Sequence, residues 1–137
     1  MNNKMKVEFS SKSINEALAR VIISGFVMPL DPTIEEISDI KTAVSEAVTN
    51  CVIHGYDGKD GIIIMEAEID DRTLIIKISD SGVGIEDINK AREPLYTTKP
   101  ECDRSGMGFT VMESFMDSLH IESAPNEGTS VTMIKRL

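Results

Sequence analysis

One long amphipathic stretch, Thr33 to His54, constrains the fold of this chain more than any other segment. Apolar residues recur in it at the three- and four-residue spacing of a helix that rests one face on a core. Thr33 followed by Glu36 predicts a capping box at its start. His54 before Gly55 is typical of a helix C-terminus with a glycine cap. The apolar positions are Ile37, Ile40, Val44, Ala47, Val48 and Cys51.

The same stretch carries Glu46, Asn50 and His54 at intervals of four residues. Four residues advance an α-helix by about 400°, so each of these side chains lies about 40° from the previous one. All three therefore border one stripe beside the apolar seam. Carboxylate and amide oxygens suit a hard cation such as Mg²⁺. Taken alone, however, the stripe fits an ordinary solvated helix face better than a metal site.

Composition predicts one acidic globular domain that spans residues 1–137, with 41% hydrophobic and 27% charged residues. The net charge of -9 argues against a nucleic-acid binder, because the phosphate backbone attracts the opposite charge. It would suit a basic protein partner, although solubility alone explains acidity in many proteins. No apolar run approaches the ~20 residues that span a bilayer, and the first residues lack a signal core. We therefore expect a cytoplasmic protein without membrane contact.

The two cysteines, Cys51 and Cys102, are far apart in the sequence and form no CxxC motif. This spacing indicates neither a disulfide framework nor a zinc site. Cys51 falls inside the helical pattern and is predicted to be a small buried apolar residue.

The remaining segments predict an α+β fold. Ser13 followed by Glu16 predicts a helix N-terminus with a capping box. The expected order is strand, two helices, a hairpin, a long loop, a helix and two strands, forming a two-layer sandwich. Its sheet is expected to be mixed but mostly antiparallel, with helices on one face. The ranges are a strand at 5–10, helices at 13–28 and 33–54, strands at 62–69 and 73–79, a short helix at 86–92, a helix from 108, and strands at 118–123 and 129–135.

A second motif, DSGVGI, directly follows a predicted strand and begins at Asp80. An aspartate at a strand end can accept a hydrogen bond from an exocyclic amine. Gly82 and Gly84 let the backbone approach a flat ligand, since glycine has no Cβ. A simple glycine-rich turn explains this motif equally well.

A third motif, SGMGF, runs from Ser105 to Phe109 at the head of a predicted helix. Glycines there expose backbone N–H groups, and the helix dipole favours an anion. Lys99 and Arg104 add positive charge just upstream. The GxG alone is weak, because it is neither a Walker A loop nor a dinucleotide fingerprint.

In this order the three motifs indicate a metal site, a base-reading site and a phosphate site around one nucleotide. Together with an EGTSV segment at residues 127–131, they resemble the GHKL ATPases and kinases, which share the Bergerat fold. Within that family, LDPTIEEISDIKTAVSEAVTNCVIHGY, PLYTTKP and RSGMGFTVMESFMD resemble the serine-kinase anti-sigma factors, and most closely the anti-sigma-F branch. The resemblance covers nearly the whole chain.

The resemblance implies a homodimer that sequesters a sporulation sigma factor of the sigma-F type. It also implies Mg-ATP-dependent phosphorylation of a serine on an anti-anti-sigma partner of the STAS class. Two alternatives stay open: a stress-response anti-sigma kinase for a different sigma factor, and a nucleotide-gated binding module without significant kinase activity. Self-phosphorylation of a histidine is not expected, because His54 lies inside the nucleotide motif and His120 in a predicted strand.

The resemblance also implies residue roles. Glu46 would act as the general base and Asn50 would coordinate Mg²⁺ at the phosphates. Asp80 and Thr129 would read the adenine amine, directly or through water, with Gly82 and Gly84 against the base.

The third motif would form the phosphate side of the site, with a lid at about 92–107. Arg20, on the first predicted helix, matches the partner-contact arginine of the family, although a solvated arginine explains it equally well. Ser130 departs from the family pattern, where a second threonine is expected. The residues implied in nucleotide binding here are Lys99, Arg104, Ser105, Gly106, Met107, Gly108 and Phe109.

Overall fold

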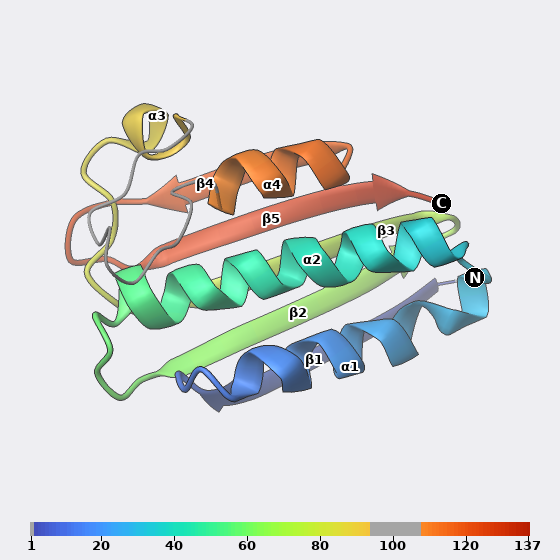
Figure 1. Ribbon diagram of the computed structural model, residues 1–137, viewed down its shortest axis with the longest axis horizontal. Coiled ribbons are helices and arrows are strands. Elements are labelled where there is room, and N and C mark those ends of the chain that lie inside the picture. The colour runs from blue at the N-terminus through green and yellow to red at the C-terminus, as the bar shows by residue number, and fades with distance from the viewer. Residues whose placement is uncertain (1, 94–107) are drawn as a thin grey trace.

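The computed structural model describes residues 2–93 and 108–137, whose strands form one five-stranded sheet. The strand order is β1-β2-β3-β5-β4, and every neighbouring pair is antiparallel (Figure 1). The predicted α+β sandwich is confirmed, and its pairings within these residues are purely antiparallel rather than mixed. The strands are β1 (Asn2–Ser10), β2 (Ile62–Asp70), β3 (Thr73–Asp80), β4 (Ser118–Ser123) and β5 (Thr129–Arg136).

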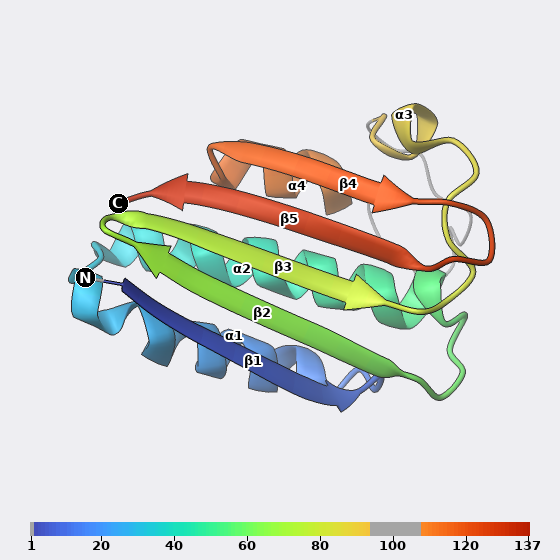
Figure 2. The ribbon, with the colours of Figure 1, turned by 180° about the vertical axis from the view of Figure 1, so that it is seen from behind.

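The helices α1 (Asn15–Val27), α2 (Ile34–Asn50) and α4 (Gly108–Phe115) cover the same face of this sheet, as predicted (Figure 1). Seen from behind, the sheet lies in front of these helices. Its other face carries no helix in the part of the chain described (Figure 2). None of the described helices is long and apolar enough to cross a membrane. The other helical segments are η1 (Met28–Leu30), η2 (Cys51–Gly55) and α3 (Ile88–Ala91).

The core lies between the sheet and these helices. Alternate residues of β2 and β3 are buried, because successive strand side chains point to opposite faces. Burying each large apolar side chain contributes roughly 1.5–3 kcal/mol. The core therefore fixes α2 along the middle of the sheet. Its central members are Ile63, Met65, Ala67, Ile69, Leu74, Ile76 and Ile78 from the sheet, and Ile40, Ala43, Val44, Ala47 and Val48 from α2.

The start of α2 confirms the capping box. Thr33 Oγ1 accepts the Glu36 N–H at 3.0 Å, and Glu36 Oε1 accepts the Thr33 N–H at 2.8 Å. This backbone hydrogen bond to the carboxylate lowers the pKa of Glu36. Two donors that a helix start leaves without helical partners are therefore satisfied.

The capping box predicted at Ser13 is wrong. The α1 helix begins at Asn15, and its N-cap residue, Ile14, makes no side-chain cap hydrogen bond. The Glu16 N–H instead donates a hydrogen bond to the backbone carbonyl of Ser13 at 3.2 Å. The Glu16 carboxylate accepts a hydrogen bond from Ser45 on α2, so it joins the two helices rather than capping one.

The predicted end of the long helix at His54 also needs correction. The α-helix ends at Asn50, and a π-helical turn, η2, covers Cys51–Gly55. Its widened turn is closed by the Tyr56 N–H, which donates to the Cys51 carbonyl at 2.9 Å. His54 therefore does not continue the 40° steps of an α-helix. Turns of this kind are rare and frequently occur at functional sites.

The remaining predicted elements lie within a few residues of their expected bounds. The β2–β3 hairpin turns at Asp71, whose φ is 56°. The short helix α3 is limited to Ile88–Ala91, with the Asp87 side chain accepting the Lys90 N–H at 3.1 Å. Most of the predicted lid at 92–107 lies outside the described residues.

Candidate nucleotide-binding site

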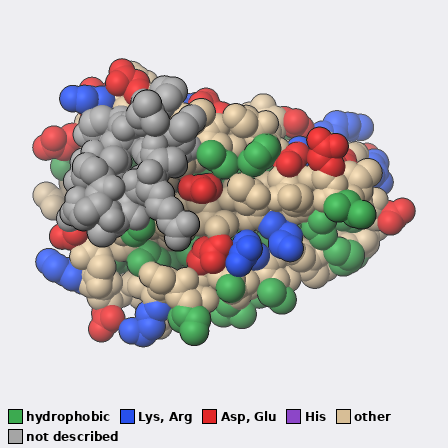
Figure 3. All heavy atoms as spheres, viewed as in Figure 1, with side chains coloured by type: hydrophobic (Ala, Val, Ile, Leu, Met, Phe, Trp, Pro, Cys, Tyr) green, Lys and Arg blue, Asp and Glu red, His purple; other side chains and the backbone are tan. Residues whose placement is uncertain are grey.

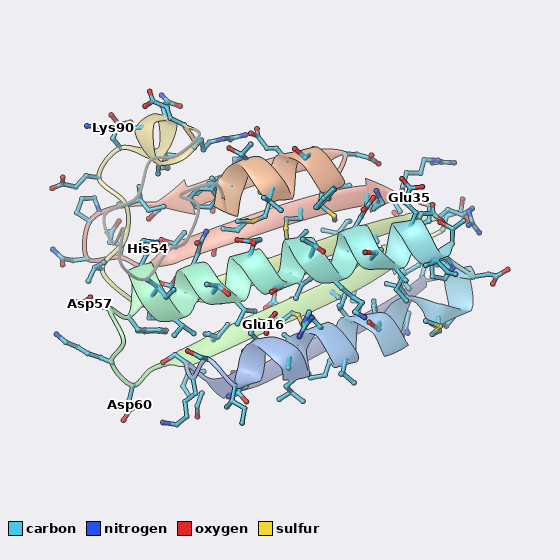
Figure 4. The ribbon with its side chains drawn as sticks, viewed as in Figure 1. Glu16, Glu35, His54, Asp57, Asp60 and Lys90 are labelled. Atoms are coloured by element: carbon cyan, nitrogen blue, oxygen red, sulfur yellow. The ribbon has the colours of Figure 1, made fainter. Side chains whose placement is uncertain are left out.

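A cavity of about 690 Å³ opens at the C-terminal end of α2. It lies between α2 and η2 on one side and the ends of β3 and β5 on the other, with α3 and the start of α4 at its margin. His54 and Lys90 lie at this end of the molecule, whereas Glu35 lies at the opposite end of α2 (Figure 4). The predicted site residues that line it are Asn50, Asp80, Gly84, Gly108, Phe109 and Thr129.

Three other predicted residues that the structure describes do not line the cavity. Glu46 stands one helical turn before Asn50 on α2 and is half-buried. Gly82 belongs to the loop after β3 but is not among the described lining residues. Arg20 lies on α1, away from the cavity. Lys99, Arg104, Ser105, Gly106 and Met107 lie outside the described residues.

Asp80 lines the cavity, and its carboxylate accepts hydrogen bonds from three segments. Its Oδ1 accepts the Gly82 N–H at 2.9 Å, and it also accepts hydrogen bonds from the Cys51 thiol and the Thr129 backbone N–H. Burial raises the pKa of Asp80, while these three donors lower it. The pKa of the Cys51 thiol is raised well above its usual value, by burial first and then by the Asp80 charge. Asp80 is therefore an oriented hydrogen-bond acceptor.

The loop after β3 needs its glycines because it passes close to other backbone segments. A Cβ at Gly82 would lie 1.8 Å from the Gly55 carbonyl oxygen. One at Gly84, whose φ is 76°, would lie 1.9 Å from the Ala124 carbonyl oxygen. Backbone hydrogen bonds at Val83 fasten the loop on both sides, to Gly55 at 2.8 Å and Asn126 at 2.6 Å. These glycines therefore fix the loop, whether or not they also touch a base.

Gly55 does not act as the glycine cap that the sequence predicts. It is not among the described glycines with positive φ. A Cβ at Gly55 would instead lie 2.6 Å from Asp80 Oδ2. The next residue, Tyr56, accepts the Ser81 N–H on its hydroxyl at 2.8 Å and donates to the Ile62 carbonyl. The π-helical turn and Tyr56 together hold the loop against the end of α2.

Asn50 and the start of α4 also line the cavity. A Cβ at Gly108 would lie 3.1 Å from both terminal atoms of the Asn50 side chain. No cluster of three His, Cys, Asp or Glu residues that could hold a metal exists within residues 2–93 and 108–137. One amide oxygen is not a zinc site, but it fits Mg²⁺, which keeps most of its ligands from water and phosphate.

Sequence reasoning missed several residues that shape the site. Cys51 is buried as predicted, but its thiol also bonds to Asp80. Nothing local marks Tyr56, whose partners lie in β2 and in the loop after β3. Ser123 bonds to Thr129 Oγ1 at 2.9 Å. The alternation of β4 could have placed Ser123 on the helix-covered face, with Leu119 and Ile121.

Comparison with known proteins agrees with this geometry. The sequence model of the histidine kinase-like ATPase domain matches residues 15–135. The chain belongs to this family. The GHKL resemblance of the sequence is therefore confirmed. An ATPase-type domain implies nucleotide binding, which the cavity at the end of α2 accommodates.

Curated members of the family are similar over nearly the full length of the chain. The anti-sigma F factor of Clostridium kluyveri (strain ATCC 8527) is 60% identical over 134 residues, covering 98% of this chain and 94% of that relative. The anti-sigma F factor of Clostridium botulinum (strain Alaska E43) is 62% identical over 135 residues, covering 98% and 94%. That of Clostridium perfringens (strain SM101) is 57% identical over 138 residues, covering 100% and 99%.

A solved structure shows the same fold at low sequence identity. The histidine kinase domain of the blue-light activated histidine kinase of Erythrobacter litoralis EL346 superposes with a TM-score of 0.60. Identity is 17%, and the match covers 89% of this chain and 61% of that one. It confirms the Bergerat-type architecture of this family.

Two glycine substitutions test whether the loop after β3 is fixed by close backbone contacts. Gly58 and Gly84 both have positive φ, but nothing lies within 4 Å of a Cβ at Gly58. We expect Gly58→Ala to cost about 1 kcal/mol of unfolding free energy, from the left-handed backbone alone. Gly84→Ala should cost about 1–3 kcal/mol more, because its Cβ overlaps the Ala124 carbonyl.

Urea unfolding measures both costs, and ADP titration shows whether the site is affected. Only Gly84→Ala should weaken ADP binding. Equal unfolding free energies for the two variants would contradict the close backbone contact.

Proposed function

We propose that this protein is an anti-sigma factor that sequesters a sporulation sigma factor of the sigma-F type. We further propose that it is a Mg-ATP-dependent serine protein kinase that phosphorylates a STAS-type anti-anti-sigma partner and so inactivates it. The observation that carries this proposal is a nucleotide-sized cavity that unites Asn50, Asp80 and Thr129 in a chain so similar to anti-sigma F factors.

The base would lie against Asp80 and Thr129 on the sheet side of the cavity. Ile78, Ile85 and Val131 line the same cavity and supply apolar contact for a flat ring. The Asp80 carboxylate would accept a hydrogen bond from the adenine amine. Small-ligand sites commonly combine such an apolar lining with a few fixed polar groups.

The phosphates would lie between Asn50 and the start of α4. The Asn50 oxygen would hold Mg²⁺, which neutralises charge on the phosphate oxygens when bound. Gly108 lets the N-terminus of α4 sit against Asn50, where its N–H groups favour an anion. We propose that Lys99, Arg104, Ser105, Gly106, Met107 and Phe109 also bind the nucleotide on this side of the site.

Glu46 is proposed to act as general base in the transfer. The serine oxygen of the partner would attack the γ-phosphorus as the bond to the β–γ bridging oxygen breaks. Glu46 would accept the serine proton, while ADP leaves with the bridging oxygen. Its place one turn before Asn50 supports this role, because both side chains then border one side of α2. Nucleotide binding alone requires no carboxylate there.

Arg20 is proposed to contact protein partners from α1. Its Nε lies 3.0 Å from Glu16 Oε1, and Glu16 also accepts a hydrogen bond from Ser45. Figure 4 places Glu16 between α1 and α2. The Arg20 side chain keeps 41% exposure. It is therefore held in place by Glu16 but still open to an acidic group of a partner.

An exposed apolar stripe on α1 supports a protein-binding role for this helix. Ile14, Leu18 and Val21 follow helical spacing and are 78%, 45% and 70% exposed. Apolar side chains line this edge of the molecule, next to the charged groups between α1 and α2 (Figure 3). Large apolar side chains gathered on one exposed face mark interaction surfaces.

We propose that the chain forms a homodimer and works in the cytoplasm.

Glu46→Ala separates binding from transfer. We expect it to retain ADP and ATP affinity within about threefold and to reduce phosphoryl transfer at least about 10²-fold, the range expected when a general base is lost. Glu35→Ala is the matched control, because Glu35 is an exposed glutamate at the far end of the same helix. Nucleotide titration and label transfer to a STAS-domain protein provide the two readouts. Retained transfer would remove Glu46 from the base role.

Arg20→Ala tests the partner contact without touching the nucleotide cavity. Sigma-factor affinity should fall about tenfold or more, as when an interface arginine is truncated, while ADP affinity stays unchanged. Lys12→Ala is the control, because it removes one positive charge from an exposed position just before α1. Equal sigma-factor affinities for both variants, measured at one salt concentration, would argue against this role.

A further inference from the structure

A cluster of hydroxyl groups joins the last two strands beside the cavity. Ser123 Oγ, at the end of β4, lies 2.8 Å from the Ile85 backbone nitrogen and 2.8 Å from the Gly128 carbonyl oxygen. Its third neighbour is Thr129 Oγ1 at 2.9 Å. One serine oxygen therefore contacts the loop after β3, the turn before β5 and a residue that lines the cavity.

Counting protons fixes the direction of each hydrogen bond. A hydroxyl has one proton to donate and two lone pairs that accept. The Gly128 carbonyl can only accept, so the Ser123 proton goes to it. The Ile85 N–H can only donate, so it occupies one lone pair of Ser123. The Thr129 hydroxyl must then donate to the remaining lone pair.

Thr129 consequently keeps only acceptor capacity for the cavity. Its hydroxyl proton is committed to Ser123, and its backbone N–H is committed to the Asp80 carboxylate. Asp80 and Thr129 face each other as register partners in the β3–β5 pair. The Asp80 carboxylate is itself an acceptor and is fixed by the Gly82 N–H. Two acceptors thus lie side by side at the place where a base would bind.

We propose that Ser123 is a positioning residue that sets the nucleobase specificity of the site. Because Ser123 accepts the hydrogen bond of the Thr129 hydroxyl, Thr129 can accept a hydrogen bond from a 6-amino purine but cannot donate one to a 6-oxo purine. This inference rests on the proposed function, in which the base lies against Asp80. It adds the reason why an amino group is selected, directly or through a bridging water.

The chain offers a matched control on the other face of the sheet. Ser79 and Ser130 form a cross-strand hydroxyl pair of 2.9 Å, the same length as the Ser123–Thr129 pair. They also join neighbouring strands, but neither lines the cavity. Losing this pair should affect stability about as much and leave nucleobase preference unchanged.

The experiment compares Mg-ADP and Mg-IDP affinities of the full chain by calorimetry. IDP carries a 6-oxo group and a proton on N1, where ADP carries a 6-amino group and an unprotonated N1. Wild type should prefer ADP, and Ser123→Ala should lower the ADP/IDP affinity ratio about 3- to 10-fold, the usual range for one hydrogen bond. Ser79→Ala should keep the wild-type ratio. A merely structural role of Ser123 would weaken both ligands equally and leave the ratio intact.

A double-mutant cycle with Thr129→Val completes the test. Thr129→Val should lower the ratio on its own, and adding Ser123→Ala should lower it no further, because no hydroxyl remains to be oriented. If Ser123→Ala binds neither diphosphate, the ADP/IDP affinity ratio of Thr129→Val tests the proposal instead. A wild-type ratio in Thr129→Val would then overturn it.

The outcomes also separate this proposal from the proposed function. A wild-type ratio in folded Ser123→Ala would overturn the role of Ser123 and leave ATP binding intact. Absence of ADP binding by the wild-type protein would overturn both.

Discussion

A carboxylate placed against the end of a long helix organises the functional half of this molecule. Burying a charged oxygen is costly unless donors surround it. Asp80 receives its donors from η2, from the loop after β3 and from the start of β5. These segments can approach only because Gly55, Gly82 and Gly128 carry no side chain, since a Cβ at any of them would overlap neighbouring atoms. The glycines of the motifs are therefore first of all requirements of close packing.

The π-helical turn is the second consequence of this constraint. It closes through Tyr56 and Cys51, which brings the Gly55 carbonyl to the Val83 N–H at 2.8 Å. The same turn places the Cys51 thiol on the Asp80 carboxylate. The helix that carries Asn50 and the loop that follows Asp80 are thus joined by backbone hydrogen bonds. Such a connection keeps the two sides of the cavity at a fixed separation.

Local signals made most of the fold predictable from the sequence. The capping box at Thr33, the period of α2 and the alternation of β2 and β3 depend on neighbouring residues, and the structure confirms each of them. The capping box predicted at Ser13 is wrong because the Glu16 carboxylate accepts a hydrogen bond from Ser45 on another helix. The partners of Tyr56 and Ser123 are likewise distant in sequence, and no local pattern reveals them. The sequence motifs predicted a common site for Asn50, Asp80 and Thr129, and all three line one cavity, but the roles of these residues remain predictions.

In the proposed reaction, a γ-phosphoryl group moves from ATP to a serine on another protein. The most direct measurement incubates the protein with γ-labelled Mg-ATP, alone and with a recombinant STAS-domain partner, and then locates the label. We expect label on a partner serine and none on this chain. Label released as free phosphate, or left on ATP despite tight binding, would contradict this expectation and favour an ATPase or a nucleotide-gated binding module.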